Sequence, residues 1–251
     1  MPHTSLEQFL KEKKIKALIF DLDGVITQTA KVHAEAWKRM FDDYLLQRGK
    51  QEGKVYEPLH IATDYRQYID GIPRYDGVRN FLKSRQIVLP EGSPEDAPGS
   101  ETVAGLGNLK NNYFHELIAQ GGVEVYDDTI AFIKQHIAQK YRTAVISASK
   151  NCKEILAAAG LEVLFEVRVD GIVSVGLGLK GKPAPDVFIE AARQLGVPPK
   201  ESAVFEDALA GVEAGTAGGF GLVVGINRTG ETTEKYVQHG ADLVLEKFPT
   251  E

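Results

Sequence analysis

The feature that most constrains the fold is an alternation of short apolar runs with stretches of helical spacing. Apolar runs of strand length occupy residues 16–21, 142–147, 202–207, 221–226 and 242–245. Helical patterns cover residues 128–139, 150–159, 185–195 and 207–217, and glycines follow several of them as C-terminal stops. Strands that alternate with helices predict an α/β fold in which a parallel sheet carries helices on both faces.

The middle of the chain follows a different pattern. Residues 31–48, 75–86 and 108–119 have helical spacing, whereas residues 87–107 are rich in Pro, Gly, Glu and Ser and predict a long loop. Loops of that length are usually functional or disordered. We therefore expect a core domain of residues 1–30 and 121–251, with a helical cap domain of residues 31–120 inserted in it.

Composition narrows the classes of protein that this chain can belong to. The net charge is −6 and no long basic run occurs, which disfavours a nucleic-acid partner. No apolar stretch is long enough for a membrane span, and the N-terminal segment lacks the apolar centre of a signal peptide. Cys152 is the only cysteine, so an intrachain disulfide is excluded. We expect a cytoplasmic monomer without a membrane partner.

Polar residues stand where three of the predicted strands end. These are Asp21, Ser147 and the pair Glu206 and Asp207. Ligands of open α/β sheets bind at the carboxyl ends of the strands, so we expect these side chains in one site. Asp21 and Asp23 form a pair in which one acid could attack phosphorus while the other moves a proton. The structural alternative is that Asp-Leu-Asp-Gly only forms a turn.

The other candidates in the core also have structural alternatives. Ser147, before a predicted helix, offers a hydroxyl to a phosphate, although Ser149 fits an ordinary N-cap. Lys182 could direct a cation at a phosphoryl group, or be an exposed lysine of a turn. Glu206 and Asp207 supply oxygen ligands that suit Mg²⁺; alternatively, Asp207 caps a helix and Glu206 is solvated.

Taken together, four motifs resemble the haloacid dehalogenase-like superfamily and, within it, the β-phosphoglucomutase family. They are DLDGV at 21–25, the strand end at Ser147, GKPAPD at 181–186 and ED at 206–207. The resemblance implies a Rossmann-like core, Mg²⁺ as cofactor and an aspartyl phosphate formed on Asp21. It further implies that Asp23 is the general acid and base and that Ser147 and Lys182 bind the phosphoryl group. The implied metal ligands are Asp21, Asp23 through its carbonyl, Glu206 and Asp207.

Shorter matches extend this resemblance to substrate binding. Those implied to bind substrate are His33, Gly71, Arg74, Lys110, Ser149, Lys150 and Asn151, with Gly71 and Arg74 holding a distal phosphate. His33 belongs to a Thr29–His33–Trp37 pattern, in which we interpret Trp37 as core packing and His33 as a hinge-side residue near Asp23. Ile72 and Pro73 depart from the residues typical of the mutases, which leaves the sugar open.

The resemblance implies a phosphorylated sugar as substrate and leaves two activities. A mutase would convert β-glucose 1-phosphate to glucose 6-phosphate through glucose 1,6-bisphosphate, whereas a phosphatase would pass the phosphoryl group to water. Arg74 favours the mutase, because a second phosphate needs a second anion site. A dehalogenase is disfavoured, since it does not need the metal and proton-transfer site of Asp23, Glu206 and Asp207. A non-catalytic sensor is disfavoured, since it needs neither a nucleophile at Asp21 nor a proton carrier at Asp23.

Overall fold

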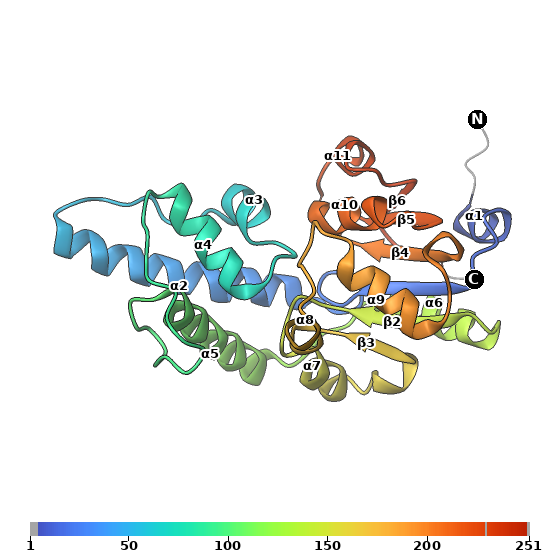
Figure 1. The fold of residues 1–251 in the computed structure, drawn as a ribbon, viewed down its shortest axis with the longest axis horizontal. Helices are drawn as coiled ribbons and strands as arrows, with labels where there is room; N and C mark the ends of the chain where they lie inside the picture. The colour runs from blue at the N-terminus through green and yellow to red at the C-terminus, as the bar shows by residue number, and fades with distance from the viewer. Residues whose placement is uncertain (1–4, 229, 250–251) are drawn as a thin grey trace. The chain divides into compact units, whose positions relative to one another are not determined.

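The computed structural model describes residues 5–228 and 230–249 and divides the chain into two compact units (Figure 1). The core unit is Met1–Gln28 with Val123–Glu251, and the cap unit is Thr29–Gly122. The first four residues of the segment searched for a signal peptide lie outside the described residues. Within the described ranges, no helix combines the length and the apolar character that a membrane span needs. The predicted cytoplasmic location, monomeric state and lack of a nucleic-acid partner stay predictions.

The core unit is built on a six-stranded sheet in which every neighbouring pair is parallel. The order across it is β3-β2-β1-β4-β5-β6. The strands are β1 (Ala17–Asp21), β2 (Arg142–Ile146), β3 (Val167–Val169), β4 (Ser202–Glu206), β5 (Leu222–Ile226) and β6 (Leu243–Leu245). This sheet, with a helical unit inserted after β1, confirms the predicted fold class.

The strand order reverses beside β1, and this places the carboxyl ends of β1, β2 and β4 side by side. In the register, Asp21 pairs with Ile146 and Phe20 pairs with Phe205. Asp21 is therefore level with Glu206, and Ser147 follows one residue beyond its neighbour. In a doubly wound sheet such a reversal is where ligands bind.

Helices flank the sheet and bury strands that are apolar on both sides. On one face, Ala17 and Ile19 of β1 share a core with Phe188. On the other, Phe20 stacks on Phe205 with ring centroids 4.6 Å apart, and Phe132 meets Phe20 edge-on. The helices of this unit are α1 (Leu6–Glu12), α6 (Asp127–Ala138), α7 (Cys152–Ala158), α8 (Gly171–Leu177), α9 (Asp186–Leu195), α10 (Leu209–Ala217), α11 (Thr233–Gln238) and the 3₁₀ turns η2 (Glu162–Leu164) and η3 (Pro199–Glu201).

The sequence located five strands of the sheet and missed the sixth, together with several short helices of the core unit. Each predicted strand agrees with the structure to within one residue at either end. The missed elements of the core unit are β3, α1, α8, α11 and the turns η2 and η3, none of which exceeds seven residues. β3 carries a half-buried arginine, Arg168, between two valines, so its apolar run is too short to distinguish from a loop.

The cap unit contains α2 (Thr29–Glu52), the π-helical turn η1 (Ile61–Tyr65), α3 (Arg66–Tyr68), α4 (Arg74–Ser84) and α5 (Val103–Gly121). Its core lies between α2, α4 and α5. Trp37 is buried there, as predicted, and stacks on Phe41 with ring centroids 5.4 Å apart. Phe81 of α4 packs on the same Phe41 ring.

The predicted loop of residues 87–107 is wrong in its last five residues, which are helical. Helix α5 begins at Val103 because the Thr102 hydroxyl accepts a hydrogen bond from the Gly105 amide at 2.9 Å. The same hydroxyl donates to Asp96 at 2.6 Å. Glycines at 105 and 107 hid this helix start, because glycine inside a helix is unfavourable. The earlier part of the loop is ordered against α5, since Val103 and Ala104 donate to the carbonyls of Pro90 and Glu91.

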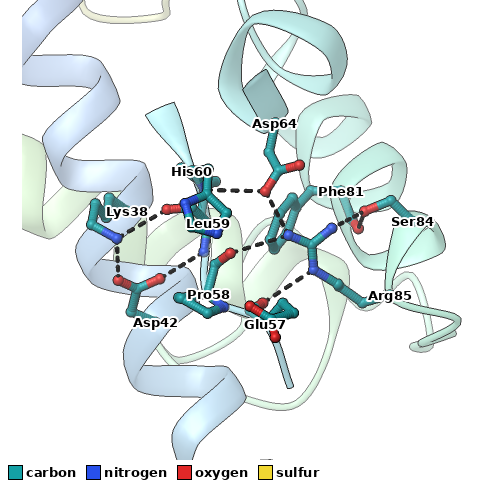
Figure 2. A network of polar contacts seen from close by, with 10 residues as sticks. All are labelled: Lys38, Asp42, Glu57, Pro58, Leu59, His60, Asp64, Phe81, Ser84 and Arg85. Carbon is teal, nitrogen blue, oxygen red and sulfur yellow. Dashed lines mark hydrogen bonds and ion pairs between the residues drawn. The ribbon is translucent and has the colours of Figure 1, made fainter. Parts of the chain in front are cut away.

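Residues 57–60, the segment before η1, belong to no helix or strand, and side chains supply hydrogen-bond partners for their backbone (Figure 2). Lys38 donates to the Leu59 carbonyl at 2.9 Å, and Asp42 accepts from the Leu59 amide at 2.9 Å. From the other side, Arg85 donates to the carbonyls of Glu57 and Pro58, each at 3.1 Å. Arg85 also pairs with Asp64 at 2.5 Å. The segment is thus fixed from both α2 and the end of α4.

We expect Arg85→Ala to reduce the free energy of unfolding of the cap unit by about 1–2 kcal/mol, because it removes the ion pair with the half-buried Asp64 and the hydrogen bonds that hold the exposed carbonyls of Glu57 and Pro58. Urea unfolding followed by the fluorescence of Trp37, the only tryptophan, measures this. Arg79→Ala, within α4, is the control, since Arg79 pairs with Glu91 at the surface and its loss should change stability far less. Equal effects of the two variants would contradict the role of Arg85.

Candidate active site

A buried ion-pair cluster lies where β1 and β4 end. The Lys182 ammonium is 2.5 Å from Asp21 Oδ1 and 3.0 and 2.9 Å from the two Glu206 carboxylate oxygens. All three side chains are at least nine-tenths buried. The alternatives in which Lys182 is exposed and Glu206 is solvated are therefore wrong. Asp207 is not the N-cap of the following helix either, because Ala208 occupies that position.

The cluster favours an ionised carboxylate at Asp21 near neutral pH. Burial raises the pKa of Asp21 to about 6, while the charge of Lys182 opposes that rise. For Lys182, burial lowers the pKa, but the carboxylates of Asp21 and Glu206 outweigh burial and raise it above its ordinary value. At neutral pH the nucleophile candidate is thus anionic and held in one orientation by a charged ammonium.

Three of the predicted metal ligands come together in a way that fits a magnesium ion. One carboxylate oxygen from each of Asp21, Glu206 and Asp207 lies within 4.8 Å of the others, and all three residues are buried. Oxygen ligands of this kind suit Mg²⁺. Lys182 supplies a single positive charge to these acids, so a divalent cation would offset the remaining negative charge. The donor set therefore fits the group that the resemblance implies.

Two glycines, which the sequence reading did not assign to the site, shape this group of acids. Gly24 has φ +90°, and a Cβ there would lie 1.8 Å from Asp207 Oδ2. A Cβ at Gly211 would lie 2.1 Å from Glu206 Oε1. Any side chain at either position would displace a carboxylate. Gly211 could have been noticed in the sequence because it lies inside the helix predicted over residues 207–217, where a glycine usually has a packing or functional reason.

Asp23 and Ser147 contact each other beside the acidic group. The Ser147 hydroxyl donates to Asp23 Oδ2 at 3.1 Å and accepts from the Ser149 amide at 3.0 Å. The Asp23 amide in turn donates to Asp21 Oδ2 at 2.9 Å. The carboxylate of Asp23 is not one of the three clustered metal-ligand candidates, and its carbonyl is the atom for which the resemblance implies that role.

The segment Ser149–Asn151 forms a turn before α7. The Ser149 hydroxyl accepts from the Asn151 amide at 3.1 Å, and the Ser149 carbonyl accepts from Gly171. The helix starts at Cys152 with Asn151 in the N-cap position, so the interpretation of Ser149 as the cap is wrong. Lys150 lies between them, half-buried. Cys152 is fully buried, and burial raises the pKa of its thiol, which disfavours a nucleophilic role.

The cap candidates fall in two places within the cap unit. Gly71 has φ +70° in the turn before α4, a conformation that favours glycine. Arg74 begins α4 and donates to Asn111 at 2.7 Å. Burial lowers the pKa of the Arg74 guanidinium, and within the part of the chain that the structure describes no carboxylate pairs with it.

Lys110 and His33, the other two candidates of the cap unit, contact each other. The Lys110 ammonium is 2.6 Å from His33 Nδ1 and lies 4.9 Å from the centre of the Phe114 ring. His33 stacks on the same ring, with centroids 4.1 Å apart. Lys110 is buried, which makes it a stronger candidate than its sequence context indicated.

Comparisons with known proteins agree with this geometry. The family model described as haloacid dehalogenase-like hydrolase matches residues 15–219. A β-phosphoglucomutase of Mycobacterium bovis is 48% identical over 235 residues, which cover 93% of this chain and 90% of the relative. A phosphorylated carbohydrates phosphatase of Thermotoga maritima is 27% identical over 213 residues, 84% of this chain and 85% of the relative.

A solved structure has the same fold. The crystal structure of a β-phosphoglucomutase from Clostridium difficile superposes with a TM-score of 0.70 at 24% identity, covering 93% of this chain and 91% of that one. The family match spans most of the chain, and the close relative matches it nearly end to end. The resemblance found in the sequence is therefore confirmed, and this enzyme belongs to the haloacid dehalogenase-like hydrolase family.

Proposed function

We propose that this enzyme is a magnesium-dependent β-phosphoglucomutase that forms an aspartyl phosphate on Asp21. It converts β-glucose 1-phosphate to glucose 6-phosphate through glucose 1,6-bisphosphate. The observation that carries the proposal is the buried Asp21 carboxylate, ionised at neutral pH and held by Lys182 beside two further acids. The 48% identity to a β-phosphoglucomutase supports the choice of substrate.

In this proposal Asp21, Glu206, Asp207 and the Asp23 carbonyl would hold the magnesium ion. When bound, the ion reduces the repulsion between the Asp21 carboxylate and the incoming phosphate. Asp21 attacks phosphorus, while Lys182 and Ser147 bind the oxygens of the phosphoryl group. The Asp23 carboxyl gives its proton to the leaving oxygen and later takes one from the acceptor hydroxyl.

Substrate binding is assigned to residues of both units. Ser149, Lys150 and Asn151 contribute from the core unit, and His33, Gly71, Arg74 and Lys110 from the cap unit. Arg74 is suited to a distal phosphate because its guanidinium is a forked donor without a carboxylate partner among the described residues. A bisphosphate intermediate needs such a second anion site, so Arg74 favours the mutase.

The test follows glucose 6-phosphate and free phosphate together after mixing the protein with Mg²⁺, β-glucose 1-phosphate and a trace of glucose 1,6-bisphosphate. The mutase predicts glucose 6-phosphate in large excess over free phosphate. Free phosphate without glucose 6-phosphate would overturn it in favour of the second candidate, a sugar-phosphate phosphatase. The similarity to the Thermotoga maritima phosphatase is the observation that keeps this candidate.

We expect the apparent affinity for Mg²⁺ to fall as the pH drops below about 6. Burial raises the pKa of Asp21 to about 6, so below that pH the carboxyl carries a proton that the metal must displace. Above pH 6 the group is ionised and the affinity should level off. Calorimetric titration with Mg²⁺ between pH 5 and pH 8 measures this. An affinity that does not change between pH 5 and pH 7 would contradict a role for Asp21 as a ligand.

A further inference from the structure

Residues 22–28, the loop that carries Asp23, are joined by hydrogen bonds between their own backbone groups. The amides of Ile26 and Thr27 both donate to the Leu22 carbonyl, at 3.0 and 2.9 Å, and the Gly24 amide donates to the Thr27 carbonyl at 2.8 Å. These hydrogen bonds hold the loop together as one unit. What fixes its direction relative to β1 therefore also fixes the Asp23 carboxyl.

One carbonyl of this loop is held by a buried side chain of α6. The Thr129 hydroxyl donates to the Val25 carbonyl at 2.7 Å, and both residues are fully buried. A hydroxyl has a single hydrogen, and here the Arg228 guanidinium donates to the same oxygen at 3.1 Å. Because the arginine takes a lone pair, the hydroxyl hydrogen points to Val25.

Arg228 is itself immobilised directly after β5. Its guanidinium pairs with Asp128 at 2.7 Å and donates to the Glu246 carbonyl at 2.8 Å. It also lies 4.2 Å from the centre of the Tyr126 ring. The end of β5, the start of α6 and the Asp23 loop are thus joined through one threonine hydroxyl.

We propose that Thr129, oriented by Arg228, is a positioning residue for proton transfer by Asp23. This rests on the proposed function, in which the Asp21–phosphorus bond forms, the bond from phosphorus to the leaving oxygen breaks, and the Asp23 proton moves to that oxygen. Without the hydroxyl, the Val25 carbonyl is buried without a donor and the loop shifts to find one. Asp21 belongs to β1, outside this loop, so proton transfer by Asp23 should fall more than attack by Asp21 does.

The test compares two phosphoryl donors in single-turnover phosphorylation of the Thr129→Val variant. Glucose 1,6-bisphosphate releases a sugar oxygen that needs a proton, whereas p-nitrophenyl phosphate releases a stable phenolate that does not. We expect the phosphorylation rate to fall about tenfold with the sugar bisphosphate and to change little with the phenyl ester. The phenyl ester also shows in the same sample that the variant is folded.

Two further variants complete the design. Thr129→Ser keeps the hydroxyl and should restore the rate. Thr143→Val is the matched control, since the buried Thr143 hydroxyl also donates to a backbone carbonyl, that of Leu164 at 2.6 Å. Thr143 lies at the start of β2, whereas the site lies where β2 ends.

The possible outcomes separate the inference from the proposed function. The role of Thr129 would be overturned if the phosphorylation rate of Thr129→Val fell equally with both donors. It would also be overturned if the rate with the sugar bisphosphate divided by the rate with the phenyl ester were the same in Thr129→Val and Thr143→Val. A wild-type protein that neither donor phosphorylates would instead overturn the proposed function. If Thr129→Val does not fold, Arg228→Gln should give the same selective loss to a smaller extent, and an unchanged ratio there would also overturn the inference.

Discussion

Asp21→Asn is expected to lower turnover of β-glucose 1-phosphate by about 10⁴-fold or more, as for the loss of a covalent nucleophile in other enzymes. The variant removes the attacking oxygen together with the negative charge that pairs with Lys182 and binds the proposed magnesium ion. An asparagine side chain can still accept the Asp23 amide, and Lys182 keeps its contacts with Glu206. The protein should therefore stay folded and carry no phosphoryl group after mixing with a phosphoryl donor.

Mass spectrometry of the intact protein after an acid quench measures the phosphoryl group, and cleavage by hydroxylamine identifies it as an acyl phosphate. The matched control is Asp23→Asn, which keeps the nucleophile and loses the acid and base. With p-nitrophenyl phosphate, this control should accumulate phosphorylated protein, because attack by water then lacks its base. Phosphorylated protein in the Asp21→Asn variant would show that another residue is the nucleophile.

The sequence predicted the sheet and the polar ends of its strands because both depend on local patterns. A buried parallel strand is a short apolar run, and Asp21 and Glu206 end such runs directly. The partners of these acids could not be predicted in the same way. Lys182 is 161 residues from Asp21, and only the fold brings its ammonium into contact. The family motif, not the spacing, indicated that this lysine belonged to the site.

The residues that support the site were harder to find, because their roles depend on contacts across the fold. Thr129 reads as an ordinary polar residue in the first turn of a helix, and its bond to Val25 spans 104 residues. Gly24 could be predicted to make a turn, but not to lie against Asp207. In the cap unit, Arg85 has no sequence signal, since two of its hydrogen bonds go to backbone carbonyls 28 and 27 residues away.

Lys182→Met is expected to have the largest effect on stability, lowering the free energy of unfolding by about 3–5 kcal/mol. The change leaves the buried carboxylates of Asp21 and Glu206 next to each other without the ammonium that lies between them. Their repulsion raises the pKa of Asp21 further, so the nucleophile takes up a proton near neutral pH. The variant should therefore lose activity as well as stability.

The cause of that loss can be separated from general damage by two comparisons of urea unfolding and one of the melting temperature. Lys16→Met is the control, because Lys16 pairs with Glu201 at the surface and its loss should change stability little. Adding Glu206→Gln to Lys182→Met removes one of the two repelling charges and should recover part of the stability. Mg²⁺ should raise the melting temperature of Lys182→Met more than that of the wild type, because the ion replaces the missing cation. If Lys182→Met is as stable as Lys16→Met, the ammonium does not hold these acids together, and the charge balance argued for the site is wrong.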